Sequence, residues 1–196
     1  MRPHPLDSQP PAVRQGPIRS VLVFCGSRSG TDPRHATLAA AVGRTLAANG
    51  VGLVYGGGAL GLMGECGRAA LAAGGRVEGV IPRFLKDWEV AEPLCNEMIV
   101  VDSLHSRKHL MFEHADAVLA LPGGLGTLDE LVEVLSWRNL RLHAEPVWLM
   151  GDGDFWQPFL ALLSHVADTG FAGADVTTYV ECLADADALA AALSLP

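Results

Sequence analysis

The amino-acid sequence predicts a doubly wound α/β domain, in which a mostly parallel sheet carries helices on both faces. From Ser20 onward, short runs rich in β-branched residues alternate with longer stretches of helical periodicity. Hydrophobic residues make up 49% of the 196 residues and charged residues only 18%, which favours a large buried core. Glycine-rich turns follow two of the strand-like runs, at the carboxyl ends where open parallel sheets bind ligands.

The expected elements follow one another in regular order. The first unit is a strand over 20–24, a loop over 26–31 and a helix over 33–49, which proline opens and Asn49-Gly50 closes. A strand over 53–55, a glycine turn and a helix over 62–73 repeat this unit. Further strands are expected over 77–81, 98–101, 117–121 and 147–150, with a weaker pattern at 176–180, and further helices over 106–114, 128–140, 155–169 and at the C-terminus. Together they predict a single Rossmann-like domain over 19–196.

Charge and the N-terminal segment narrow the set of partners. The formal net charge of −8, with no run of Lys or Arg, argues against binding to polymeric nucleic acid and still permits a small anionic substrate. Residues 1–18 are rich in proline and contain no apolar run, so we expect a flexible tail and neither a signal peptide nor a membrane span. Four widely spaced cysteines without a C-x-x-C pair favour reduced thiols and a cytoplasmic protein.

The first glycine turn has the spacing of a dinucleotide fingerprint. Gly56, Gly58 and Gly61 fit G-x-G-x-x-G between a strand and a helix. The next strand ends in Ile81-Pro82-Arg83, without the acid that holds a ribose hydroxyl, so NAD is disfavoured, while Arg83 leaves NADP open. No P-loop motif is present. The turn predicts either contact with a ligand or close packing of the helix on the sheet.

The second glycine turn, Pro122 to Thr127, is more informative. Its glycines allow backbone N–H groups to converge at the positive end of a helix dipole, which makes an anion socket. The competing interpretation is an ordinary connection with Thr127 as the N-cap. Glu130, three residues later, would then complete a capping box. Spacing alone leaves both interpretations open.

A basic cluster opens the helix expected over 106–114. Ser106 is its predicted N-cap, and Arg107 and Lys108 would then place positive charge in a first turn, against the helix dipole. A bound phosphate would explain these cations, whereas a solvated basic face is the alternative. His105 and His109 share a helical face, but no carboxylate pattern accompanies them, so we expect no metal site. Lys108 also suits a phosphate contact better than a Schiff base with pyridoxal.

Taken together, these motifs resemble the Lonely Guy (LOG) family of cytokinin riboside 5′-monophosphate phosphoribohydrolases. The matching segments are Val23 to Ser27, Tyr55 to Gly58 with Gly61 to Gly64, Arg107-Lys108, and the complete P-G-G-x-G-T-x-x-E signature at Pro122 to Glu130. The resemblance covers about 21–171. Two positions depart from the family pattern, Leu104 where methionine is usual and Asp129 where glutamate is usual.

The resemblance implies roles for individual residues. Arg107 and Glu130 would be catalytic. The implied substrate-binding residues are Glu89, Lys108, Gly123, Gly124, Leu125, Gly126, Thr127, Gly26, Ser27, Gly57, Gly58 and Met63. The implied reaction is hydrolysis of the N-glycosidic bond of a purine nucleoside 5′-monophosphate, without a cofactor, to give free base and ribose 5-phosphate. Glu130 would stabilise the oxocarbenium-like transition state.

Two expectations accompany this function. The alternative is a nucleotide-binding or carrier module of the same fold without catalysis, which the glycine turns would serve equally well. The apolar helix carrying Leu131, Val132, Val134, Leu135 and Trp137 is either core or partly an interface. The family resemblance favours a homodimer or a larger homo-oligomer.

Overall fold

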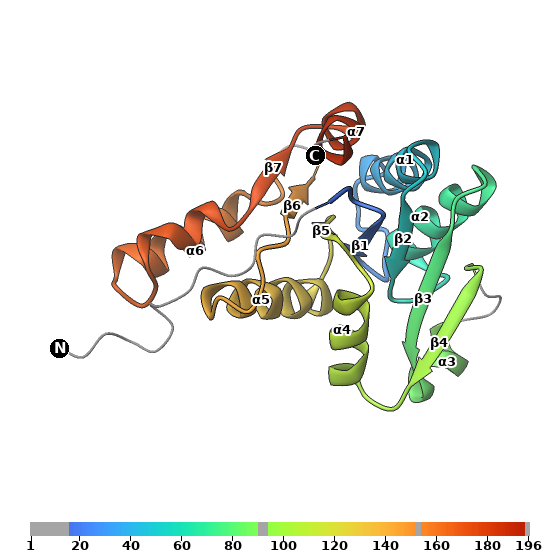
Figure 1. Ribbon diagram of the computed structural model, residues 1–196, viewed down its shortest axis with the longest axis horizontal. Coiled ribbons are helices and arrows are strands. Elements are labelled where there is room, and N and C mark those ends of the chain that lie inside the picture. The colour runs from blue at the N-terminus through green and yellow to red at the C-terminus, as the bar shows by residue number, and fades with distance from the viewer. Residues whose placement is uncertain (1–15, 90–93, 152–153, 195–196) are drawn as a thin grey trace.

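Seven parallel strands form a single sheet. The computed structural model describes residues 16–89, 94–151 and 154–194. The strands are β1 (Ser20–Phe24), β2 (Gly52–Tyr55), β3 (Val77–Pro82), β4 (Glu97–Val101), β5 (Ala117–Ala120), β6 (Val147–Met150) and β7 (Glu181–Leu183). Their order across the sheet is β4-β3-β2-β1-β5-β6-β7 (Figure 1). The chain adds strands outward from β1 in one direction and from β5 in the other, so the two loops that follow β1 and β5 flank the switch point of the sheet.

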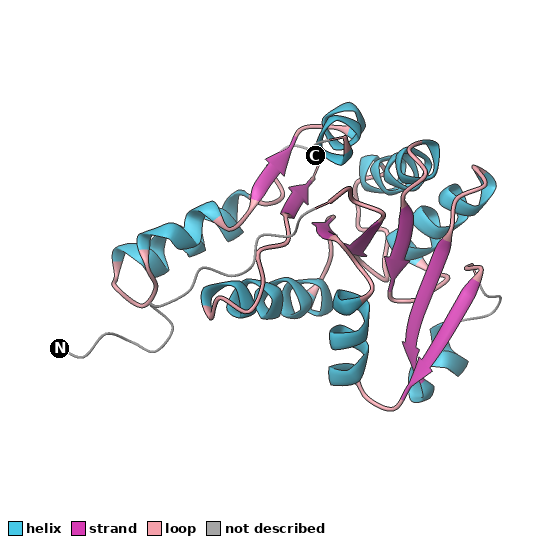
Figure 2. Ribbon diagram, in the orientation of Figure 1, coloured by secondary structure: helices cyan, strands magenta, loops and turns pink. Residues whose placement is uncertain are grey.

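Helices cover both faces of the sheet, which confirms the doubly wound class (Figures 1 and 2). Val21 and Val23 of β1 pack in a cluster with α1 (Arg34–Ala48), α2 (Gly61–Ala72) and α7 (Ala186–Leu193). Leu22 and Phe24 point to the other face and pack with α4 (Leu104–Glu113), α5 (Leu125–Asn139) and α6 (Gln157–Asp168). All five side chains of β1 are buried, as expected of a central strand covered on both sides.

Helices α1 and α2 approach closely on their shared face. A Cβ at Gly43 of α1 would collide with the carbonyl oxygen of Cys66 and would lie 2.9 Å from the amide nitrogen of Ala70, both in the backbone of α2. Only glycine allows this separation of the helix axes. The contact fixes α2 against α1, and the amino ends of both helices lie beside the switch point.

Two predicted element starts are wrong. Helix α4 begins at Leu104, and its N-cap is Ser103, whose hydroxyl accepts from the amide of Ser106 at 3.0 Å. Helix α5 begins at Leu125 with Gly124 as N-cap, so the glycine-rich segment that the sequence assigns to the turn forms the first turn of the helix. A short helix, α3 (Arg83–Glu89), also follows β3 where none was expected.

The strand predicted over 176–180 is wrong. Ala174–Thr178 forms a 3₁₀ helix, η2, and β7 begins only at Glu181. The β-branched residues of η2 favour a strand by propensity, but its two threonine hydroxyls donate hydrogen bonds to the local backbone. Thr177 donates to the Ala174 carbonyl at 3.2 Å and Thr178 to the Asp175 carbonyl at 2.7 Å. These local bonds close a tight turn in place of a ladder.

The N-terminal tail expected over 1–18 falls largely outside the described residues. Among the described residues, no helix has the length and apolar character required to cross a bilayer.

Candidate active site

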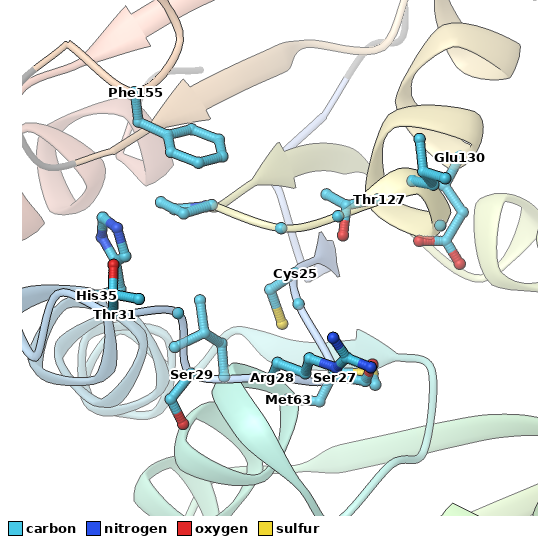
Figure 3. A pocket seen from close by; sticks show the side chains of 18 of the residues that line it. Cys25, Ser27, Arg28, Ser29, Thr31, His35, Met63, Thr127, Glu130 and Phe155 are labelled. Carbon is cyan, nitrogen blue, oxygen red and sulfur yellow. The ribbon is translucent and has the colours of Figure 1, made fainter.

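A cleft of about 800 Å³ opens at the switch point of the sheet (Figure 3). Its walls come mainly from the loop after β1 and from the turn between β5 and α5. These two segments are tied at their start, because the amide of Leu121 donates to the Phe24 carbonyl at 2.8 Å and the amide of Gly26 to the Pro122 carbonyl at 3.0 Å. The parallel pairing of β1 and β5 therefore brings both glycine-containing segments to one place.

The amino end of α5 forms one wall of the cleft. Gly124 caps the helix in an extended conformation and, as a glycine, gives the first-turn N–H groups no side-chain hydrogen bond. Gly123, Gly124, Leu125, Gly126 and Thr127 all line the cleft. A Cβ at Gly124 or Gly126 would meet nothing within 4 Å, so packing does not require glycine there, whereas one at Gly123 would collide with Thr127. Open N–H groups at the positive end of a helix dipole form a site suited to an anion.

Glu130 lies on the first turns of α5 and also lines the cleft. Because α5 begins at Leu125, Thr127 is the third helical residue and not the N-cap. The capping box predicted for Thr127 and Glu130 is therefore absent. Figure 3 shows Thr127 and Glu130 on the same helix, with Ser27 and Met63 across the pocket. Glu130 thus lines the cleft from α5, five residues beyond the first residue of the helix.

Arg107 is built into the floor of the same cleft. Its side chain comes from α4 and is only 8% exposed, and its Nε donates to the Val80 carbonyl at 3.1 Å. Its Nη2 donates to the Gly56 carbonyl at 2.9 Å. A guanidinium has five N–H donors, so further donors remain for the cleft that it lines. Two carbonyls from the carboxyl edge of the sheet hold it in one orientation.

The first glycine turn makes room for this arginine. A Cβ at Gly56 would collide with Nη2 of Arg107, and Gly57 packs against Met98 and Ile81 at a φ of 75°. Gly57 and Gly58, predicted to bind substrate, are buried at this turn, and neither is among the residues that line the cleft. The turn contributes to the site by accepting the guanidinium of Arg107. Arg83, which left NADP open, is likewise exposed on α3 and outside the cleft lining.

The pKa of Cys25, the residue after β1, is shifted by burial and by nearby ionisable side chains. Burial raises the pKa of the Cys25 thiol well above its usual 9.0; the neighbouring Cys66 and Glu130 raise it further, and Arg107 lowers it. Glu130 and Arg107 therefore both lie close enough to Cys25 to affect its pKa. A thiol held protonated in this way is a poor nucleophile.

Lys108 is not among the residues that line the cleft, and its ion pairs link α4 to α5. Its Nζ lies 3.0 Å from Oδ2 of Asp129 and 2.8 Å from Oε2 of Glu133. Partial burial lowers the pKa of Lys108, but the hydrogen bonds that Lys108 donates to Glu133 and Asp129 outweigh this and raise the pKa above its usual value. Arg107 and Lys108 thus have partners within the chain, and they are the fourth and fifth residues of a helix that begins at Leu104.

Of the other residues predicted to bind substrate, three line the cleft and one has a side chain that is not described. Gly26, Ser27 and Met63 line the cleft. Glu89 ends α3, and its side chain lies outside the described residues. No cluster of His, Cys, Asp and Glu suited to a metal ion occurs among the residues that the structure describes.

Side chains of the cleft that the sequence interpretation did not identify include Arg28, His35 and Phe155. His35 and Phe155 meet edge to face, with ring centroids 5.8 Å apart. Arg28 is the fourth residue after β1, so its position in the loop beside a switch point was an available signal. Phe155 follows β6, and its approach to α1 depends on tertiary packing that no local motif encodes.

Comparison with known proteins places this geometry in a family. The family model described as "Possible lysine decarboxylase" matches residues 63–193. A cytokinin riboside 5′-monophosphate phosphoribohydrolase of Rhodococcoides fascians is 40% identical over 197 residues, covering 100% of this chain and 99% of the relative. An enzyme of the same name from Arabidopsis thaliana is 41% identical, covering 79% of this chain and 68% of the relative.

Solved structures share the fold at lower identity. The molybdenum cofactor carrier protein of Chlamydomonas reinhardtii superposes with a TM-score of 0.65 at 24% identity, over 91% of this chain and 96% of that one. DNA processing protein A of Helicobacter pylori superposes with a TM-score of 0.59 at 15% identity, over 96% and 90%. These two likenesses concern the fold alone. The extent and identity of the sequence matches show that the chain belongs to the Lonely Guy (LOG) family.

Proposed function

We propose that this protein is a phosphoribohydrolase, which hydrolyses the N-glycosidic bond of a cytokinin-type purine nucleoside 5′-monophosphate to free base and ribose 5-phosphate. The observation that carries the proposal is the convergence of Glu130, Arg107 and the open amino end of α5 on one cleft. Relatives that match most or all of the chain bear the name of this activity. The cleft volume is in the range of small-molecule sites.

In the proposed mechanism, the first-turn amides of α5 bind the 5′-phosphate. Cleavage of the glycosidic bond develops positive charge on the ribose, which the Glu130 carboxylate stabilises while it assists the attack of water. Arg107, fixed by the Val80 and Gly56 carbonyls, orients the sugar against that carboxylate. Lys108 does not contact the substrate in this mechanism; its ion pairs to Asp129 and Glu133 hold α4 against α5.

One assay tests the reaction and its substrate together. Purified protein is incubated with AMP, with isopentenyladenosine monophosphate and with adenosine, and released base and ribose 5-phosphate are measured. We expect equimolar base and ribose 5-phosphate from the monophosphates and little reaction with adenosine, because binding of the remote phosphate positions the reacting centre. Tight binding of both monophosphates without base release would instead indicate a carrier.

We also propose that the protein assembles as a homodimer through α5. Leu131, Val134 and Leu135 are buried, so these three apolar residues of the helix belong to the hydrophobic core and not to an interface. Leu128 and Val132 lie four residues apart on a second helical face; Leu128 is only partly buried and Val132 is 48% exposed.

Light scattering coupled to size exclusion tests this assembly. The wild type is expected to elute at twice the mass of one chain, and Val132→Asp at the mass of one chain, because a buried unpaired carboxylate disfavours association. Thr37→Asp on the exposed surface of α1 is the matched control. A wild type at the mass of one chain would contradict the proposal.

A further inference from the structure

The cleft contains two arginine side chains, and the chain uses them differently. Arg107 is buried and commits two of its nitrogens to backbone carbonyls. Arg28 lines the same cleft from the loop after β1 and is exposed. Within the described ranges of the chain, the Arg28 guanidinium has no hydrogen bond and no ion pair. Arg28 is therefore the cleft arginine whose full set of donors faces outward.

The backbone that carries Arg28 is held firmly. The amides of Leu62 and Met63, at the start of α2, donate to the Gly26 carbonyl at 2.9 and 3.3 Å. Gly61 adopts a φ of 57°, and a Cβ there would collide with the backbone of Ser27 and Arg28. Close contact with α2 thus fixes the origin of the Arg28 side chain, while the side chain itself remains free to reorient.

This origin lies next to the anion site of α5. A Cβ at Gly26 would meet the Arg28 carbonyl oxygen at 2.9 Å and the Gly123 Cα at 3.3 Å, so a single glycine separates the two loops. Figure 3 shows Arg28 and Ser27 across the pocket from Thr127. An anion bound at the first turn of α5 would therefore have helix amides on one side and the Arg28 loop on the other.

We propose that Arg28 is a phosphate-binding residue that closes over the 5′-phosphate from the side opposite α5. The inference rests on the proposed function for the identity of the ligand. A guanidinium can grip two phosphate oxygens at once, which suits the dianionic group of a nucleoside monophosphate. Arg28 thereby favours phosphorylated substrates over free nucleosides. The competing view is that Arg28 is a solvated surface side chain, which contributes nothing to binding.

Calorimetric titration with ribose 5-phosphate tests the contact without any turnover. Arg28→Ala is expected to weaken binding of ribose 5-phosphate by about 10- to 100-fold, the range for loss of a charge-assisted bond. Its thermal midpoint should equal that of the wild type, because the side chain has no partner to lose among the described residues. Arg44→Ala, an exposed arginine of α1 outside the cleft, is the matched control and should bind like the wild type.

Turnover gives a second readout. The ratio of kcat/KM for AMP to that for adenosine should fall in Arg28→Ala by the same factor as the affinity for ribose 5-phosphate. Unchanged affinity and an unchanged ratio would overturn the role of Arg28. If the wild type releases no base from any monophosphate, the proposed function fails, yet the titration with ribose 5-phosphate still reports on Arg28.

Discussion

At the scale of single residues, Glu130 can be tested separately from the fold. The helix does not depend on it as a cap, since Gly124 occupies that position. Glu130→Gln keeps the shape of the side chain and removes its charge. We expect kcat for AMP to fall by about 10²- to 10⁴-fold, with the thermal midpoint and the affinity for ribose 5-phosphate nearly unchanged. Glu65→Gln on α2 is the exposed control. Wild-type kcat in Glu130→Gln would remove Glu130 from the mechanism.

Arg107 is different, because the same hydrogen bonds serve stability and function. Arg107→Lys retains the charge but loses the forked donors that reach the carbonyls of Val80 and Gly56. We expect the free energy of unfolding to fall by about 1–3 kcal/mol, since buried carbonyls lose their donors. We expect kcat/KM to fall as well. Urea denaturation and steady-state kinetics measure the two effects. Arg68→Lys, an exposed arginine bonded to the Ala59 carbonyl, should change neither appreciably; wild-type behaviour of Arg107→Lys would contradict this reading.

At the scale of elements, the first turn of α5 is shaped by ligand approach more than by helix stability. Gly126 is the second residue of this helix, and a methyl group there would meet nothing within 4 Å. Gly126→Ala should therefore stabilise the protein by about 0.5–1 kcal/mol through helix propensity. The same methyl group would crowd the phosphate, so kcat/KM for AMP should fall at least about tenfold, which corresponds to about 1.4 kcal/mol.

The control for this helix lies further along it. Ser136→Ala, at an exposed position of α5 outside the cleft, should gain stability without losing activity. Thermal melting and AMP hydrolysis are measured on both variants. Full activity in Gly126→Ala would show that the ligand does not approach this turn.

The elements also show how far local sequence determines this site. Alternating strand and helix patterns predicted the sheet, and the P-G-G-x-G-T segment, which the sequence left open between an anion socket and a helix cap, lines the cleft. The start of α5 was misplaced because glycine has low helix propensity, whereas the tie between Gly26 and Pro122 holds that segment at the sheet edge. Lys108 was interpreted as a phosphate ligand because its partners Asp129 and Glu133 lie on another helix and carry no local signal.

At the scale of the whole molecule, strand order explains why the site could be predicted at all. In a doubly wound sheet the loops at the switch point have no neighbouring crossover to cover them. Motifs that follow β1 and β5 therefore meet by topology, even though about a hundred residues separate them. Phe155 required the folded structure, because its approach to His35 of α1 depends on packing between elements and not on motif spacing.

Buried thiols in the core predict how the whole molecule responds to alkali. Burial raises the pKa of Cys66 from 9.0 to about 12 and that of Cys25 well above 9.0. Above pH 9 the unfolded chain loses these protons while the folded chain keeps them, so the unfolded state binds fewer protons and stability falls as pH rises. Each thiol contributes a slope of about 1.4 kcal/mol per pH unit.

Urea midpoints under reducing conditions from about pH 8 to 11 measure this slope, over a window set by the ordinary thiol pKa. Cys66→Ala removes one titrating thiol from the core. The variant should be less stable at neutral pH because of the cavity it leaves, yet its stability should fall less steeply with pH. Tyr55 and Cys25, whose pKa values burial also raises, titrate in both proteins, and the variant additionally loses the smaller contribution of Cys66 to both of these shifts. Parallel curves for the two proteins would show that the Cys66 thiol does not govern the alkaline limit of this fold.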